Sequence, residues 1–205
     1  MRPVAAHCGF VMFQYTSDMT TTVTTTGAFT IEDLEGFPSD GNRYELIEGS
    51  LHVTPSPLFN HQRVVSNVFF LLRSACPPEF EVLVSPLDVV LGVDTVVQPD
   101  ILVIPVAPPG TRRIEQAPLL AVEVQSPSTR LYDLGTKRMV YEEAGVGAYW
   151  VVAPSGPSIA EWRWPASGVA GGTGRERTVE GDDEFVADWP FSVSAVPSRL
   201  LLPGG

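Results

Sequence analysis

Three apolar runs between residues 81 and 125 constrain the fold more than any other feature of the sequence. Residues 81–91, 96–106 and 119–125 are rich in Val, Leu and Ile, and Gly or Pro residues separate them. Such residues are typical of strands, whereas Gly and Pro interrupt strands. We therefore expect these three runs to form a central sheet.

Two helices are predicted to pack on this sheet. In residues 58–75, apolar side chains recur at helical spacing, and a Pro-Pro pair ends the segment. A second helix is expected to begin at Ser128 or Asp133 and to reach residue 144, followed by a strand over residues 148–152. The order of elements predicts a mixed α/β (α+β) domain.

The two ends of the chain are predicted to be peripheral. Ser and Thr dominate the later part of residues 1–27, so this segment buries little surface and is expected to be a flexible arm before a single domain over residues 28–205. Thr30 is a predicted N-cap of a short helix. Added strands are expected over residues 43–47, 50–53, 159–164 and 178–185, the first two joined as a hairpin at Glu48-Gly49.

The charge balance of the chain is acidic. Asp and Glu outnumber Lys and Arg by 24 to 13, which gives the 205 residues a formal net charge of −11. This charge weakens non-specific attraction to phosphate backbones and excludes a histone-like or coating role. An enzyme that meets nucleic acid through a local basic patch remains compatible with it.

Cysteine usage and hydropathy favour a cytoplasmic protein. Cys8 and Cys76 lie far apart and without C-x-x-C spacing, so neither a disulfide framework nor a thiolate zinc site is predicted. The apolar stretch near the N-terminus is interrupted and has no export cleavage site. No segment reaches the roughly 20 apolar residues that span a bilayer.

Two acidic residues lie within the predicted strands. Asp100 follows Pro99 and precedes four apolar residues, and Glu123 lies inside an apolar run. A buried ionised carboxylate is strongly disfavoured unless it is paired, hydrogen-bonded or bound to a cation. Two acids that converge on one hard cation would meet this requirement, and strand-end acids that face water are the alternative. Because side chains alternate along a strand, Gln125 shares a face with Glu123.

An ordered set of residues resembles one bacterial family. It comprises Tyr44-Glu-Leu-Ile-Glu-Gly49, His61, Pro99-Asp100, Glu123-Val-Gln-Ser-Pro-Ser-Thr129, Asp133, Lys137, Tyr141, Gly145-Val146 and Tyr149-Trp150. The set is collinear with, and similar to, the pattern of the Uma family of restriction endonucleases in the PD-(D/E)xK nuclease superfamily. The resemblance covers residues 44–154. It implies a restriction-endonuclease-like core, in which helices flank a mixed sheet and the active acids lie on adjacent strands.

The resemblance implies a metal site at the two acids. Asp100 and Glu123 match the family's magnesium ligands, with manganese as a substitute ion. Magnesium keeps several waters, so two carboxylates and one backbone carbonyl, that of Val124, are expected to suffice. Such an ion lowers the pKa of a bound water and neutralises charge that develops on the phosphate.

The third motif position departs from the superfamily pattern, because Gln125 stands where lysine is usual. The resemblance places the catalytic lysine at Lys137 on the following helix, and Gln125 remains a catalytic candidate beside Glu123. Residues spaced i, i+4 and i+8 share roughly one helical face, so Asp133, Lys137 and Tyr141 are expected to point toward the sheet. A surface pair between Asp133 and Lys137 is the alternative.

Four further residues are candidates for accessory roles. Glu45 is expected to hold metal or water, unless it is an edge-strand acid paired to Arg43 or a lysine. His61, in the first turn of the main helix, is expected to contact substrate phosphate or carry a proton. The hydroxyls of Ser126 and Ser128 are expected to bind phosphate at a helix N-terminus. The alternatives are that His61 is a hydrogen-bonded scaffold residue and that the serines form an ordinary helix N-cap.

Together these residues predict a magnesium-dependent phosphodiesterase, an endonuclease that hydrolyses nucleic-acid phosphodiester bonds. DNA is the expected partner, and a homodimer is the expected assembly. A nuclease-like nucleic-acid-binding or regulatory module that does not cleave is an alternative, motivated by Gln125 and the acidic charge. A small-molecule or protein-interaction domain is another, and it would need a pocket without Lys137 near the acids.

Overall fold

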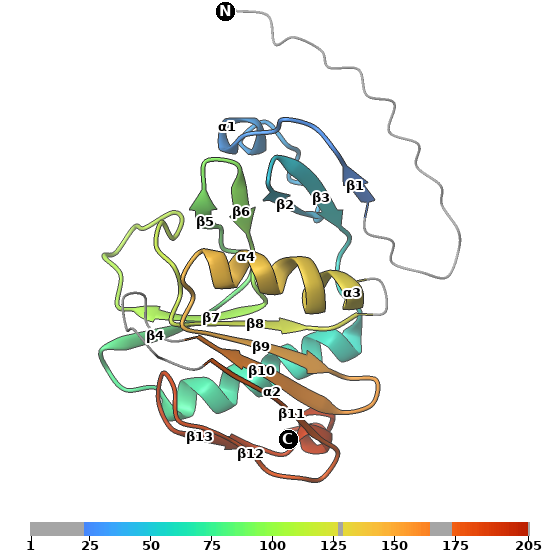
Figure 1. The fold of residues 1–205 in the computed structure, drawn as a ribbon, viewed down its shortest axis with the longest axis vertical. Helices are drawn as coiled ribbons and strands as arrows, with labels where there is room; N and C mark the ends of the chain where they lie inside the picture. The colour runs from blue at the N-terminus through green and yellow to red at the C-terminus, as the bar shows by residue number, and fades with distance from the viewer. Residues whose placement is uncertain (1–22, 127–128, 165–173, 205) are drawn as a thin grey trace, which may run out of the picture.

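A six-stranded sheet forms the centre of the molecule in the computed structural model, which describes residues 23–126, 129–164 and 174–204 (Figure 1). The strand order is β11-β10-β9-β8-β7-β4. Strands β8 and β9 run parallel, and the other neighbours run antiparallel. The strands are β4 (Phe80–Val84), β7 (Ile101–Pro105), β8 (Leu120–Val124), β9 (Ala148–Ala153), β10 (Ser158–Arg163) and β11 (Arg175–Glu180).

Helices cover both faces of this sheet (Figure 1). Helix α2 (Phe59–Ala75) packs on one face, and a continuous helical segment packs on the other: α3 (Arg130–Tyr132), the π-helical turn η1 (Asp133–Lys137) and α4 (Arg138–Glu143). Successive side chains of β7 pack alternately with the two layers, because side chains alternate along a strand. The predicted mixed sheet flanked by helices is therefore confirmed. No helix of these residues has the length and apolarity to cross a membrane.

A second, five-stranded sheet lies on the α4 side of the molecule (Figure 1). Its order is β1-β3-β2-β6-β5, and helix α1 (Ile31–Leu34) packs against its small apolar core. Its strands are β1 (Val23–Thr25), β2 (Arg43–Ile47), β3 (Ser50–Thr54), β5 (Val89–Gly92) and β6 (Thr95–Val97). The predicted hairpin is confirmed as β2 and β3. Its turn residues Glu48 and Gly49 have φ angles of 50° and 72°, as a two-residue type I′ turn requires.

The C-terminal elements pack under α2. Strands β12 (Phe185–Ala187) and β13 (Val193–Ala195) form a two-stranded sheet, and the short helix η2 (Pro197–Leu201) follows. All three contribute buried side chains to the core on the α2 face. These elements close the side of the main sheet opposite to α4.

Three predicted strands are each divided in two. Residues 81–91 contain β4 and β5, and residues 96–106 contain β6 and β7, which lie in different sheets. Pro86 and Pro99 lie at these breaks and have no amide hydrogen to continue a ladder. Residues 178–185 likewise contain the end of β11 and the start of β12. The expectation of one central sheet from all three apolar runs is therefore wrong for β5 and β6.

The expected arm over residues 1–27 is also too long at its C-terminal end. Val23, Thr24 and Thr25 form β1 and pair with β3 in antiparallel register. These residues therefore belong to the second sheet, and residues 1–22 lie outside the described part of the chain.

Gly147, just before β9, leaves no space for a side chain. A Cβ at this position would lie 2.8 Å from both Leu119 O and Trp189 Nε1, two atoms that share a hydrogen bond of 3.2 Å. We expect Gly147→Ala to lower the free energy of unfolding by about 1–3 kcal/mol, because the added methyl group overpacks this contact. Urea denaturation measures the loss. Gly135→Ala is the control, since its methyl group meets nothing within 4 Å; equal losses in the two variants would contradict the prediction.

Candidate active site

A cavity of about 350 Å³ lies beside the N-terminal end of α2, between the main sheet and β2 of the second sheet. Four acidic and three basic side chains line it, from β2, α2, β8, η1 and the position before β7. The cavity brings together every described candidate from the sequence: Glu45, His61, Asp100, Glu123, Val124, Gln125, Ser126 and Lys137. Ser128 lies outside the described residues.

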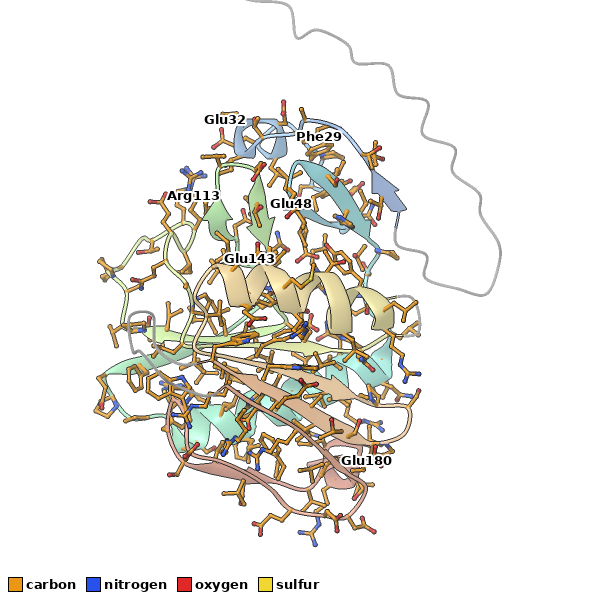
Figure 2. All side chains as sticks on the ribbon, viewed as in Figure 1. Phe29, Glu32, Glu48, Arg113, Glu143 and Glu180 are labelled. Atoms are coloured by element: carbon orange, nitrogen blue, oxygen red, sulfur yellow. The ribbon has the colours of Figure 1, made fainter. Side chains whose placement is uncertain are left out.

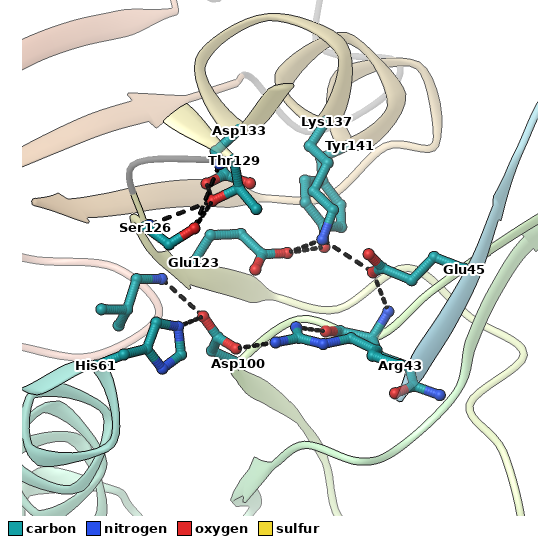
Figure 3. A network of polar contacts seen from close by, with 12 residues as sticks. Arg43, Glu45, His61, Asp100, Glu123, Ser126, Thr129, Asp133, Lys137 and Tyr141 are labelled. Carbon is teal, nitrogen blue, oxygen red and sulfur yellow. Dashed lines mark hydrogen bonds and ion pairs between the residues drawn. The ribbon is translucent and has the colours of Figure 1, made fainter. Parts of the chain in front are cut away.

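The two predicted acids face each other across neighbouring strands. In the antiparallel β7–β8 ladder, Leu102 is opposite Ala121 and Ile101 is opposite Val122. One further step of this register places Asp100 opposite Glu123, on the sheet face that packs against α4. Figure 3 shows both carboxylates directed into the same space. Like charges directly opposite on a sheet destabilise it, so this pair needs compensation.

Asp100 obtains compensation from three neighbours (Figure 3). Its Oδ2 accepts a hydrogen bond from the Val124 amide at 2.8 Å and lies 3.1 Å from His61 Nε2. Its Oδ1 lies 3.0 Å from Arg43 Nη2. Burial opposes ionisation, but the Arg43 guanidinium and the His61 contact hold the pKa of Asp100 well below its usual range. Asp100 is therefore ionised at the floor of the cavity.

Glu123 is compensated by Lys137, which also holds Glu45 (Figure 3). Lys137 Nζ donates to Glu123 Oε1 at 2.7 Å and to Glu45 Oε1 at 2.9 Å, and the Tyr141 hydroxyl donates to the same Glu123 oxygen at 3.0 Å. Burial lowers the pKa of Lys137, but the two carboxylates outweigh it and hold that pKa above its ordinary value. The lysine therefore carries its charge inside the protein.

One ammonium does not fully offset the acids around it. Burial raises the pKa of Glu123 to about 8, and the nearby Asp100, Asp133 and Glu45 add to the effect although Lys137 opposes it. Burial similarly raises the pKa of Asp133 to about 6. At pH 7 a carboxyl group with a pKa of about 8 is mostly protonated, whereas one with a pKa of about 6 is mostly ionised. Glu123 therefore keeps a proton near neutral pH, and the cavity can accept more positive charge than its own side chains supply.

The helical segment presents Asp133, Lys137 and Tyr141 to the sheet, at the predicted spacing, and all three are buried. Asp133 Oδ2 accepts a hydrogen bond from the Thr129 hydroxyl at 2.7 Å, and its backbone oxygen accepts one from the Tyr149 hydroxyl at 3.0 Å. Lys137 forms its ion pairs with Glu123 and Glu45. The alternative of a solvent-exposed Asp133–Lys137 pair is thereby excluded.

The expected phosphate contacts are less accessible than the sequence indicated. His61 binds Asp100, and its Nδ1 is buried without a hydrogen-bond partner among the described residues. The Ser126 hydroxyl lies 3.0 Å from Thr129 Oγ1, an arrangement typical of a local turn. Gln125 is half-buried on the cavity wall.

Arg43 is a site residue that the sequence analysis considered only as a partner for Glu45. It contacts Asp100, and its Nη1 donates to Gln98 O at 2.8 Å. The signal was present, because Arg43 and Glu45 are two residues apart in one strand and therefore share a face. The Tyr141 hydroxyl donates a further hydrogen bond to Glu123. The sequence predicted Tyr141 on the helical face that points to the sheet, but it did not predict this hydrogen bond.

Within the described ranges, no group of three or more His, Cys, Asp and Glu side chains is arranged to hold a metal ion. The opposed pair of Asp100 and Glu123 is the arrangement that the residues do form. Two carboxylates are within the number of protein ligands that magnesium takes, because this ion keeps several of its waters.

The solved structures include one with a similar fold. It is described as that of "a putative nuclease belonging to DUF820" from Anabaena variabilis ATCC 29413, with a TM-score of 0.65. The two sequences are 18% identical, and the match covers 79% of this chain and 89% of the other. At this identity the likeness shows the fold alone. No curated protein matches the chain.

The family is shown by a second comparison. Residues 31–193 match the family model of Uma2, described as "Putative restriction endonuclease". The match includes both acids, Lys137 and all six strands of the main sheet. The chain therefore belongs to the Uma2 family.

Proposed function

We propose that this protein is a magnesium-dependent endonuclease that hydrolyses phosphodiester bonds of nucleic acids, with DNA as its substrate. The description of the family as a restriction endonuclease and the nuclease-like fold support a nuclease. One observation carries the finer proposal: the β7–β8 register places Asp100 opposite Glu123, and the Lys137 ammonium lies 2.7 Å from Glu123.

The donor set fits a hard divalent cation. Asp100 Oδ1 is buried and forms an ion pair with Arg43 Nη2 at 3.0 Å, without the geometry of a hydrogen bond. Both hydrogen bonds that Glu123 accepts from these residues go to Oε1. Carboxylate oxygens are the ligands that magnesium and manganese prefer. Asp100 and Glu123 would hold the ion, with the Val124 carbonyl as the third ligand.

The chain's own residues have distinct roles in this proposal. A bound divalent ion supplies an activated water and neutralises charge on the phosphate. Lys137 carries a permanent positive charge toward the same space and stabilises the negative charge that develops in the transition state. Glu45 and the Tyr141 hydroxyl hold Lys137 and Glu123 in place. Gln125, on the same face as Glu123, contributes a polar side chain to the cavity wall.

One observation favours a nuclease-like module that does not cleave. Without a metal ion, Asp100 is already paired with Arg43 and His61, and Glu45 with Lys137. These ion pairs let the buried residues serve as a scaffold, although the pKa of Glu123 stays raised. Binding of magnesium without turnover of any nucleic acid would select this alternative over the endonuclease.

The proposal predicts that activity depends on the two acids. We expect Asp100→Asn and Glu123→Gln each to lower the rate of metal-dependent DNA cleavage by at least about 100-fold, as loss of a group that stabilises the transition state does elsewhere. Calorimetry with magnesium and manganese should show weaker binding in both variants. Glu143→Gln, an exposed acid on α4 (Figure 2), is the control and should match the wild type. Wild-type cleavage by Asp100→Asn would refute the assignment.

The raised pKa of Glu123 predicts that the free energy of unfolding depends on pH when a chelator keeps metal ions away from the protein. The group ionises near 4.5 when unfolded and near 8 when folded. Between these values unfolding releases a proton, so wild-type stability should fall as pH rises, by up to roughly 1.4 kcal/mol per pH unit. Glu123→Gln keeps the hydrogen-bond acceptor without the charge, so its stability should lack this fall.

Urea denaturation at several pH values, with EDTA and then with excess magnesium, measures both effects. Magnesium should remove most of the difference between wild type and Glu123→Gln at pH 8, because it compensates the ionised carboxylate. Parallel stability curves for the two proteins in EDTA would show that Glu123 is not strained by burial.

A further inference from the structure

We propose that the cavity accepts an unpaired nucleic-acid strand, and that the exposed Phe59 at its mouth stacks on a base of that strand. This inference rests on the proposed nuclease function and specifies its substrate. Three features carry it: the depth of the acids, the exposed side chains at the start of α2, and the distribution of charge.

The acids lie too deep for the backbone of an intact duplex to reach them easily. The side chains of Asp100 and Glu123 are only 3% and 4% exposed, at the floor of a cavity of about 350 Å³. This volume is near the lower end of the range of about 300–1,000 Å³ for sites that enclose small molecules. The phosphates of a duplex follow the path of a stiff helix, so a phosphate reaches the floor of this cavity only if the backbone is deformed locally, at a cost in free energy. An unpaired strand avoids much of this cost.

The start of α2 presents apolar side chains beside the mouth of the cavity. Leu58, which lines the cavity, is 60% exposed, and the next residue, Phe59, is 73% exposed. The Arg63 guanidinium lies 4.8 Å from the centre of the Phe59 ring, and Arg63 also lines the cavity. An exposed ring next to a cation is the combination that binds single strands, because the ring stacks on a base and the cation attracts the phosphate. In a duplex, the neighbouring base pairs already cover the faces of each base.

The charge distribution also favours a short, unpaired segment. Duplex binding relies on many phosphate contacts, and this chain has 13 basic residues against 24 acidic ones. Within the cavity lining, four carboxylates face three cationic side chains, so one divalent ion reverses the excess when all four acids are ionised. A cavity that holds such an ion therefore attracts phosphate although the whole chain is acidic, and stacking at its mouth supplies sequence-independent affinity.

The structure offers a matched pair of variants to test this. Phe59 and Phe70 lie on the same helix and are 73% and 69% exposed, but Phe70 lies about three turns from Phe59 and about two turns from Arg63, the last residue of α2 that lines the cavity. Each is replaced by alanine, and thermal unfolding checks that both variants fold. Fluorescence anisotropy then measures binding of labelled DNA and RNA single strands and of the matching duplexes, with calcium in place of magnesium.

We expect the wild type to bind the single strands at least about 10-fold more tightly than the duplexes. Phe59→Ala should weaken single-strand binding by roughly 5- to 100-fold, the range expected for loss of one base–aromatic stack. Phe70→Ala should bind like the wild type. A difference between the DNA and RNA strands would identify the preferred sugar, and either preference supports the inference.

Other outcomes overturn the inference and separate it from the proposed function. Tighter binding of the duplex, or equal effects of the two alanine variants, would overturn the inference. If duplex DNA were nevertheless cleaved in a metal-dependent way, the nuclease proposal would stand. A change in the mass of the particle on size exclusion in Phe59→Ala, with unchanged nucleic-acid affinity, would show that the mouth is a protein contact. Absence of binding and cleavage with every nucleic acid would overturn both proposals.

Discussion

The rest of the site depends on two like charges that the β7–β8 register holds opposite each other. Asp100 and Glu123 are both buried, and neither can remain ionised at low cost without a nearby positive charge. Arg43 and Lys137 supply that charge, and the hydrogen bonds from the Val124 amide and the Tyr141 hydroxyl satisfy further oxygen atoms. Breaking such a buried ion pair costs more than its net stabilisation, because it leaves a charge without a partner.

The compensating groups come from separate layers of the fold. Arg43 and Glu45 belong to β2 of the second sheet, whereas Lys137 belongs to the helical segment that covers the main sheet. The cavity exists where these layers meet the N-terminal end of α2. The second sheet therefore has a chemical role, since it closes the cavity and contributes Arg43 to the ion pair with Asp100 and Glu45 to the ion pair with Lys137. Lys137 comes from the helical segment, whereas the superfamily pattern has a lysine at the position of Gln125. Both residues line the same cavity, so an amine at either position is directed into the same space.

Much of the fold was predictable, and the errors in the two apolar runs over residues 81–91 and 96–106 share one cause. The long helix, the β2–β3 hairpin and the strands β8, β9 and β10 follow from periodicity and turn residues. The runs over residues 81–91 and 96–106 were each predicted as one strand, but β4 and β7 join the main sheet while β5 and β6 join the other. Both sheets require the same apolar, β-branched residues, so composition alone does not assign a strand to one of them.

The sequence by itself determined the long helix, the β2–β3 hairpin and the strands β8, β9 and β10, and it placed Asp133, Lys137 and Tyr141 on one helical face. The reason is that the spacing of side chains along a helix or strand is a local property of the chain. Only the tertiary structure decided which charges pair. Lys137 binds Glu123, 14 residues away, and Glu45, 92 residues away, while Arg43 binds Asp100 instead of Glu45. These partners depend on strand register and on the packing of layers, which arise from hydrogen bonds and contacts between segments far apart in the chain.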